Sequence, residues 1–418
     1  MPANRLLIDV RPLRESPAFS RLLAGAGLSA VGSSMTGFAV VLQVFTLTRS
    51  SLAVGAVGIA MAVPAIGFGL LGGSVVDAHD RRRIVLCTSS CLAAVSAAFA
   101  ALAFAGNRQL WPLYLLVTVQ SLLGALDGPA RRTFLPRLLP AHRVPAGAAL
   151  TAFAARGSVI AGPALAGVIA AAWGLKACYL VDAVSFGAAL YGVARLPPMP
   201  PQGQPARPGL RAVADALRFI RGSRVLTGAL VADMSAMVLG VPSAVFPAIN
   251  LAHFGGATQT LGLIAAAPGV GGVLGTVLSG SVGRVSRQGR AMLVTGAVWG
   301  ACVAGFGLAH SLWLALVLLG VSGGADVFSV VFRTTMVQLS TPDRYRGRAS
   351  AAEYVAGVGG PRLGDFRAGA VSSLASPTIS AVSGGLSVIV ASVLIAVAMP
   401  AFFRYRATNS VVAGQRAA

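Results

Sequence analysis

Long apolar stretches separated by short polar segments extend along almost the entire chain. A membrane-spanning helix needs about 20 mostly apolar residues, and twelve stretches meet this requirement. They cover residues 22–46, 52–76, 84–105, 110–130, 146–172, 177–195, 225–252, 258–282, 291–309, 311–332, 349–373 and 378–402. The pattern therefore predicts an all-α integral membrane protein with twelve transmembrane helices.

A long segment in the middle of the chain, residues 196–224, interrupts this pattern. Prolines in its first part break any span, and its second part has the composition of a short amphipathic surface helix. The segment separates an N-terminal six-helix half (1–195) from a C-terminal six-helix half (225–418). The halves also repeat, because GSVVDAHDRRR at 73–83 has a counterpart in GSVGRVSRQGR at 280–290. Two related halves with a site between them form a transporter architecture.

The composition agrees with a membrane location. Hydrophobic residues make up 56% of the chain and charged residues only 11%, whereas a soluble domain carries about 25% charged residues. The formal net charge of +21 is spread in small basic groups. A nucleic-acid-binding protein gathers such charge on one face, so we expect no nucleic-acid partner. The lipid bilayer is the expected surrounding.

The basic groups also predict the orientation of the chain. With the N-terminus inside, the outer loops contain only Arg49, Arg108 and Lys176 of the 33 basic residues. Most of the others, including Arg333 just after the tenth span, then fall in cytoplasmic segments. Basic residues concentrate in the cytoplasmic loops of membrane proteins. The sequence thus predicts a multi-pass protein of a bacterial-type inner membrane, with both termini cytoplasmic.

A charged cluster follows the second predicted span. In GGSVVDAHDRRRIVL (72–86), Gly73, Asp77, Arg81 and Arg82 fit the loop motif of the major facilitator superfamily, which the chain resembles. The resemblance implies the major facilitator fold. It also implies that Asp77 and the arginines form a conformational latch, which holds the two halves together while the transporter is open to the outside.

Other segments resemble the branch of this superfamily that contains the enterobactin exporters of enteric bacteria. Asp80 is acidic where that branch is acidic, and similar segments are found at 16–35 (SPAFSRLLAGAGLSAVGSSM), 246–249 (FPAI) and 341–350 (TPDRYRGRAS). This resemblance implies export of a siderophore or a comparable amphipathic molecule.

The fifth span carries a second marker. GSVIAGPALAG (157–167) resembles the antiporter motif of drug–proton exporters, with Gly157, Gly162, Pro163 and Gly167 as its packing residues. Small residues let helices approach closely, and proline removes one backbone hydrogen bond. The resemblance implies export rather than uptake, whereas the alternative is ordinary small-residue packing.

Carboxylates inside the predicted spans are candidates for proton coupling, because a charged residue in the bilayer is costly and is neutralised when it binds a proton. These are Asp233, Asp326 and Asp365. Asp365 has an alternative role in a fixed ion pair, since Arg362 is three residues away on the same helix face. Asp233 has no basic neighbour within its own span and is the first choice for coupling.

Three further residues are candidates for the substrate cavity. Arg156 lies ten residues into the fifth span and is expected to face either the cavity or a carboxylate of the protein. In the cavity it would attract an anionic substrate. Gln120 stands in the fourth span where members of the superfamily commonly have an arginine. Asp127 lies near the cytoplasmic end of the same span, where a gate, a latch or a solvated carboxylate is expected.

These observations predict a secondary active exporter of a small amphipathic molecule, such as a catecholate siderophore or a drug, driven by proton antiport and alternating access. The alternatives are a multidrug exporter without a siderophore role and a non-transporting receptor on the same scaffold. No Walker or HExxH motif is present, and the four histidines are dispersed in the sequence. We therefore expect no enzyme activity, no cofactor and no metal site. The expected partners are a small-molecule substrate and protons, and the expected oligomeric state is a monomer.

Overall fold

The computed structural model describes residues 9–200, 218, 221–279, 285–341 and 343–406, without the side chains of 69–78 and 343–355. These residues form helices, with no strand among them. The helices of the first half of the chain are α1 (Arg11–Glu15), α2 (Pro17–Thr48), α3 (Ser51–Ala78), α4 (Arg81–Phe104), α5 (Trp111–Arg132), α6 (Leu135–Leu138), η1 (Ala141–Arg143), α7 (Val144–Trp173) and α8 (Leu175–Ala194). Those of the second half are α10 (Arg224–Gly240), η2 (Ser243–Val245), α11 (Phe246–His253), α12 (Thr258–Leu278), α13 (Gln288–Leu308), α14 (Leu312–Ser340), α15 (Asp343–Leu374), α16 (Pro377–Ala398) and α17 (Pro400–Phe403).

The prediction of an all-α membrane protein is confirmed. Within the described residues, eleven helical segments are long and apolar enough to cross a membrane. The eleventh predicted span, 349–373, lies in α15, which contains Arg362, Asp365 and Arg367 and is not among these eleven segments. Many large apolar side chains point outward, as a bilayer requires; Leu374, for example, is 88% exposed.

Polar side chains and proline or glycine determine where several helices begin and end. The hydroxyl of Ser16 accepts a hydrogen bond from the backbone N–H of Phe19, and Asp80 does the same for Arg82 at the start of α4. Such caps satisfy backbone N–H groups that have no helical acceptor. Gly174, with φ of 80°, separates α7 from α8. The sequence therefore specifies these boundaries locally.

Contacts between residues divide the chain into two compact units. Unit 1 comprises residues 1–49, 59–209 and 256–266. Unit 2 comprises residues 50–58, 210–255 and 267–418. The helices α3 and α12 are thus divided between the units. The expected boundary at 196–224 remains a prediction, because most of that segment lies outside the described residues.

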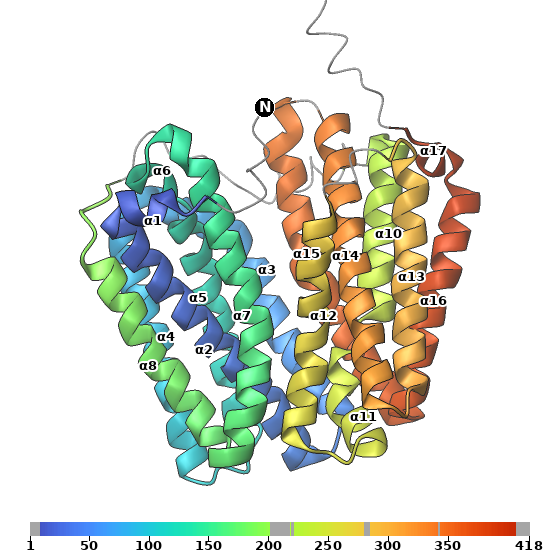
Figure 1. Ribbon diagram of the computed structural model, residues 1–418, viewed down its shortest axis with the longest axis horizontal. Helices are drawn as coiled ribbons and strands as arrows, with labels where there is room; N and C mark the ends of the chain where they lie inside the picture. Colours follow the sequence, from blue (N-terminus) through green and yellow to red (C-terminus); the bar gives the residue numbers. More distant parts are fainter. Residues whose placement is uncertain (1–8, 201–217, 219–220, 280–284, 342, 407–418) are drawn as a thin grey trace, which may run out of the picture. The chain divides into compact units, whose positions relative to one another are not determined.

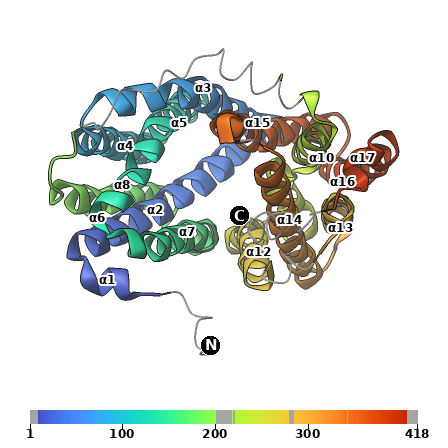
Figure 2. The ribbon, with the colours of Figure 1, turned by 90° about the horizontal axis from the view of Figure 1, so that it is seen from above.

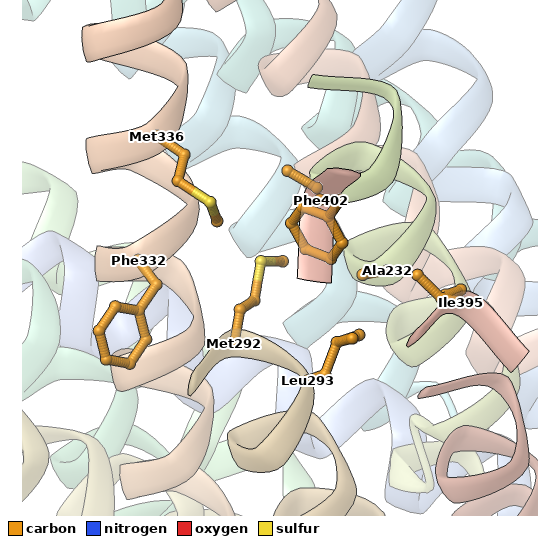
Figure 3. Close-up of a cluster of buried hydrophobic side chains, with 8 residues drawn as sticks. Ala232, Met292, Leu293, Phe332, Met336, Ile395 and Phe402 are labelled. Atoms are coloured by element: carbon orange, nitrogen blue, oxygen red, sulfur yellow. The ribbon is translucent and has the colours of Figure 1, made fainter. Parts of the chain in front are cut away.

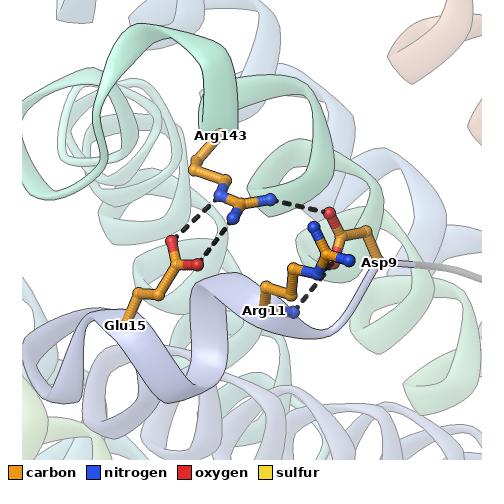
Figure 4. A network of polar contacts seen from close by, with 4 residues as sticks. All are labelled: Asp9, Arg11, Glu15 and Arg143. Atoms are coloured by element: carbon orange, nitrogen blue, oxygen red, sulfur yellow. Dashed lines mark hydrogen bonds and ion pairs between the residues drawn. The ribbon is translucent and has the colours of Figure 1, made fainter.

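Unit 1 is a bundle in which α2 packs against α7 and α8, and α4 packs against α5 and α8 (Figures 1 and 2). Phe99 of α4 stacks on Tyr179 of α8, with ring centroids 5.2 Å apart. The N-terminal segment is tied down by polar contacts. Arg143 binds Glu15 through two hydrogen bonds of 2.9 and 2.6 Å and Asp9 through one of 3.0 Å (Figure 4).

Unit 2 is held together by contacts of α13 with α14 and α16, and of α10 with α15 and α16. One apolar cluster joins four of these helices and α17, and Figure 3 shows its side chains converging from separate helices. Its buried members are Ala229, Ala232, Met292, Leu293, Phe332, Met336, Ile395 and Phe402. The short helix α17 thereby fixes the last described turn of the chain onto unit 2.

The seventh predicted span, 225–252, is not one regular helix. The segment from Arg224 to His253 is interrupted between α10 and η2, at Val241 and Pro242. Proline lacks a backbone N–H and clashes with the preceding turn, so Pro242 and Pro247 do not fit the interior of a continuous helix. A helix interrupted inside a membrane needs other groups to satisfy its free backbone atoms.

Candidate functional site

Asp233 of α10 forms a buried ion pair with Arg333 of α14. The two side chains are 4% and 12% exposed. The sequence pattern assigns Arg333 to a loop after the tenth span; this is wrong, because α14 continues through that position to Ser340. The guanidinium compensates the charge of the carboxylate where water is excluded.

Asp365 of α15 lies at the interruption between α10 and η2. It accepts hydrogen bonds from the hydroxyl of Ser243 and the backbone N–H of Ala244. The ion pair that the spacing suggested is also present, with Arg362 Nη1 at 3.9 Å from Asp365 Oδ2. The carboxylate therefore satisfies backbone and hydroxyl donors that the interrupted helix leaves without helical acceptors.

Asp326 is half-buried in α14. It precedes Arg333 by seven residues, or about two helical turns, so the two residues share one face of α14. The three carboxylates proposed for proton coupling thus lie on three helices of unit 2, and Asp233 and Asp365 have different arginine partners. Their role in coupling remains a prediction.

Asp127 of α5 lies in a polar network within unit 1. It accepts a hydrogen bond of 2.7 Å from Thr88 of α4 and forms an ion pair with Arg131 one turn later. Arg131 also donates to the hydroxyl of Ser89 at 2.7 Å. The network joins α4 to α5, and Asp127 is only 9% exposed.

The cluster around the start of α4 binds the chain that follows α8. Arg82 donates to the carbonyls of Val193 and Ala194 at the end of α8, at 3.4 and 2.7 Å. Arg81 is 8% exposed and donates to the carbonyl of Pro200 at 3.5 Å. A cation at a helix C-terminus is favourable, because the last carbonyl groups lack helical donors.

Gly73 and Asp77, the other members of the predicted latch, lie in α3 within 69–78, whose side chains are outside the described part of the chain. The latch therefore remains a prediction.

The residues of the antiporter motif differ in what surrounds them. A Cβ at Gly162 would meet Ser34 of α2, and one at Gly167 would lie 3.0 Å from the Cα of Gly262 in α12. Pro163 belongs to the same contact, because a Cβ at Gly262 would lie 2.7 Å from its carbonyl oxygen. Gly157 has nothing within 4 Å of its Cβ position. Close helix packing thus requires Gly162 and Gly167, whereas Gly157 is not needed for it.

The remaining cavity candidates are less enclosed. Arg156 is exposed on α7, and Gln120 is half-buried on α5. A separate apolar groove of about 520 Å³ lies between α12, α13 and α14 in unit 2. None of the candidate residues lines that groove.

Two histidines far apart in the sequence meet in unit 2. The rings of His253 and His310 stack with centroids 4.8 Å apart. The Nδ1 of His253 is 2.9 Å from the carbonyl oxygen of Ala309, and its Nε2 is 3.2 Å from the hydroxyl of Thr378. These contacts tie α11 to α16. Across the described residues, no group of three or more His, Cys, Asp or Glu side chains could hold a metal ion.

From the sequence, Asp182 near the outer end of the sixth span is interpreted as a helix cap, whereas the structure places it inside α8. Asp182 of α8 is completely buried in unit 1 and accepts hydrogen bonds from Ser33 and Thr36 of α2 and Ser96 of α4. These partners are small polar residues within apolar spans, so no linear motif marks them. Only the packing of α2, α4 and α8 brings them together.

A family of transporters accounts for this architecture. The model of the family described as "transmembrane secretion effector" matches residues 9–414. The chain belongs to this family of the major facilitator superfamily. Membership makes the chain a multi-pass membrane transporter for small molecules rather than an enzyme.

Named relatives of this family member are similar over nearly their whole length. The chain is 26% identical to the enterobactin exporter EntS of Citrobacter koseri (strain ATCC BAA-895 / CDC 4225-83 / SGSC4696), with 96% of each chain covered. It is also 26% identical to EntS of Salmonella typhi, covering 97% of this chain and 98% of the relative.

Solved structures share the fold. The nucleoside transporter NupG has a TM-score of 0.72 at 14% identity, with 93% of this chain and 99% of that chain covered. A bacterial homologue of the iron transporter ferroportin has a TM-score of 0.65 at 17% identity, with 93% and 98% covered. At these identities the likeness concerns the fold alone.

Proposed function

We propose that this family member is a secondary active exporter that moves a small amphipathic molecule out of the cell in exchange for protons. The similarity to proteins named enterobactin exporter, over 96% of the chain, carries the proposal. We further propose that it acts as a monomer in the inner membrane, with both termini cytoplasmic and two six-helix halves that rock during alternating access.

The substrate class follows from the relatives. An enterobactin-like molecule is a catecholate, which combines aromatic rings with ionisable oxygens. We assign such a siderophore-like compound as cargo. The tight crossing of α7 with α2 and α12 at Gly162 and Gly167 supports export, because these glycines belong to the segment that resembles the antiporter motif.

The Asp233–Arg333 pair is our first choice for coupling. While Asp233 is ionised, Arg333 compensates its charge. Binding of a proton to Asp233 removes that charge and with it the ion pair with Arg333, so the contact between α10 and α14 weakens. Uptake and release of the proton then favour different arrangements of these helices.

Transport by purified protein in liposomes with an imposed pH gradient tests the proposal. We expect accumulation of a catecholate siderophore when the gradient is present and none when it is collapsed. In Asp233→Asn, gradient-driven accumulation should be lost while exchange of labelled for unlabelled substrate persists.

Asp127→Asn is the matched control, because it also neutralises the carboxylate of a buried aspartate–arginine pair. It should alter accumulation and exchange to the same extent. Unchanged gradient-driven accumulation by Asp233→Asn would remove Asp233 from the coupling mechanism. Transport of drugs but not of any catecholate would reject the siderophore assignment.

A further inference from the structure

Asp182 is enclosed by hydroxyl groups from two neighbouring helices. Its Oδ2 accepts hydrogen bonds of 2.7 Å from both Thr36 and Ser96, and its Oδ1 accepts one of 3.2 Å from Ser33. The carboxylate is 0% exposed. We name Asp182 and these three hydroxyl residues the hydroxyl cage.

The close approach of α2 and α8 at this point depends on a glycine. A Cβ at Gly32 would lie 2.5 Å from the hydroxyl of Ser185 and 2.7 Å from Asp182 Oδ1. Ser185 is engaged with the backbone, because its hydroxyl donates to the carbonyl of Asp182 at 2.7 Å. Only a residue without a side chain fits between the two helices here.

No cation compensates this carboxylate among the described residues. The charged residues of the helices in contact with α8, and of α8 itself, are Arg21, Arg81, Arg82, Arg83, Arg156 and Lys176. None forms an ion pair with Asp182. The nearest titratable neighbours in the sequence have other partners, because Tyr179 donates to Gln43 at 2.7 Å and Cys178 to the carbonyl of Ala166 at 3.7 Å.

The chemistry of the partners separates this carboxylate from the others. A hydroxyl donates one hydrogen bond and also accepts, whereas a guanidinium only donates. The hydroxyl cage can therefore satisfy an ionised Asp182, by donating to it, and a protonated Asp182, by accepting from it. Arg333 satisfies only the ionised form of Asp233.

We propose that Asp182 is a proton-binding site in unit 1, with the hydroxyl cage as the structure that accommodates its protonated and ionised forms. A protonated Oδ2 donates to the oxygen of Thr36 or Ser96, and that hydroxyl turns to a backbone carbonyl of its own helix, as serine and threonine commonly do. The proton comes from water and returns to water, with no other reactant.

Burial links proton binding to conformation. Because Asp182 has no exposed surface, a proton enters or leaves only when α2, α4 or α8 moves. The binding site itself does not depend on export, whereas its use in the transport cycle rests on the proposed function. A carrier that uses Asp182 in unit 1 and Asp233 in unit 2 would bind protons in both units.

Infrared difference spectra of the purified full-length protein, recorded between acidic and alkaline buffers, test the proposal. A protonated carboxylic acid gives a C=O stretching band that a carboxylate lacks. We expect one such band to disappear in Asp182→Asn and to persist in Asp233→Asn. Thr36→Val should shift its frequency, because it removes one hydrogen-bond partner of the acid.

Ser158→Ala is the control, since the buried Ser158 hydroxyl donates to the carbonyl of Ala155 in its own helix. It should leave the band unchanged. A spectrum of Asp182→Asn identical to that of the unaltered protein would overturn the proposal.

Two variants that retain Asp182 test the proposal if Asp182→Asn cannot be purified. Ser96→Ala and Thr36→Val each remove one hydroxyl partner and should shift the frequency of the C=O band. An unchanged frequency in both variants would contradict the proposal. The spectra require no transport. A band that depends on Asp182 together with absent transport would therefore reject the proposed export but support the proton site.

Discussion

Two buried aspartates, one in each unit, have opposite kinds of partner. Asp182 of unit 1 is 0% exposed and Asp233 of unit 2 is 3% exposed. Asp182 is bound by three hydroxyls from α2 and α4, whereas Asp233 is bound by the guanidinium of Arg333. The two carboxylates are thus similarly buried, but one is stabilised by neutral hydroxyls and the other by a cation.

The difference determines how each site responds to the loss of one partner. The charge of Asp233 depends on a single cation, so removing that cation leaves a buried charge uncompensated. Asp182 has three neutral partners, and removal of one leaves two. We therefore expect a single substitution to destabilise the Asp233–Arg333 pair strongly. Removal of one hydroxyl from the hydroxyl cage should destabilise unit 1 less, because the other two hydroxyls still bind Asp182.

Arg333→Gln should have the largest effect on stability. Breaking a buried ion pair by removing one partner costs about 3–5 kcal/mol. We expect a large fall in the thermal unfolding temperature of the protein in detergent. Asp233→Asn/Arg333→Gln should recover most of the loss, because neither charge remains. A double variant as unstable as Arg333→Gln would show that Arg333 acts through other contacts.

Gly32→Ala tests the hydroxyl cage by forcing α2 and α8 apart. The new Cβ would lie 2.7 Å from Asp182 Oδ1, and overpacking of this kind costs about 1–3 kcal/mol. Gly157→Ala is the matched control, because its Cβ meets nothing within 4 Å. Alanine is the better helix former by roughly 0.5–1 kcal/mol, so the control should be neutral or more stable. Equal thermal stability of the two variants would contradict the close contact at Gly32.

Most of the helices could be predicted from the sequence, because about 20 consecutive apolar residues have few alternatives in a membrane protein. The seventh span shows the limit of this reasoning. Val241 and Pro242 interrupt it, yet proline barely lowers the hydropathy of a long apolar window. The tenth span shows another limit, because α14 continues to Ser340 past the charged Arg333.

The candidate site could be predicted only in part. Asp233 and Asp365 are conspicuous because a charged residue is rare in an apolar span. Their partners are less easily found: Arg362 is three residues from Asp365, but Arg333 is far from Asp233 in the sequence. The hydroxyl partners of Asp182 cannot be identified from the sequence, since serine and threonine are common in membrane helices and their convergence depends on helix packing.

Ser96→Ala should have the smallest effect and is the finest test of the comparison. Loss of one hydrogen bond to a charged group costs about 1.5–3 kcal/mol, and loss of a neutral one about 0.5–1.5 kcal/mol. If Asp182 exchanges a proton, the cost in thermal unfolding should therefore be greater in alkaline than in acidic buffer, because only the ionised acid needs every donor. Ser158→Ala, which removes a bond to a backbone carbonyl, should cost the same in both buffers. A cost of Ser96→Ala that does not change with pH would mean that Asp182 keeps one protonation state.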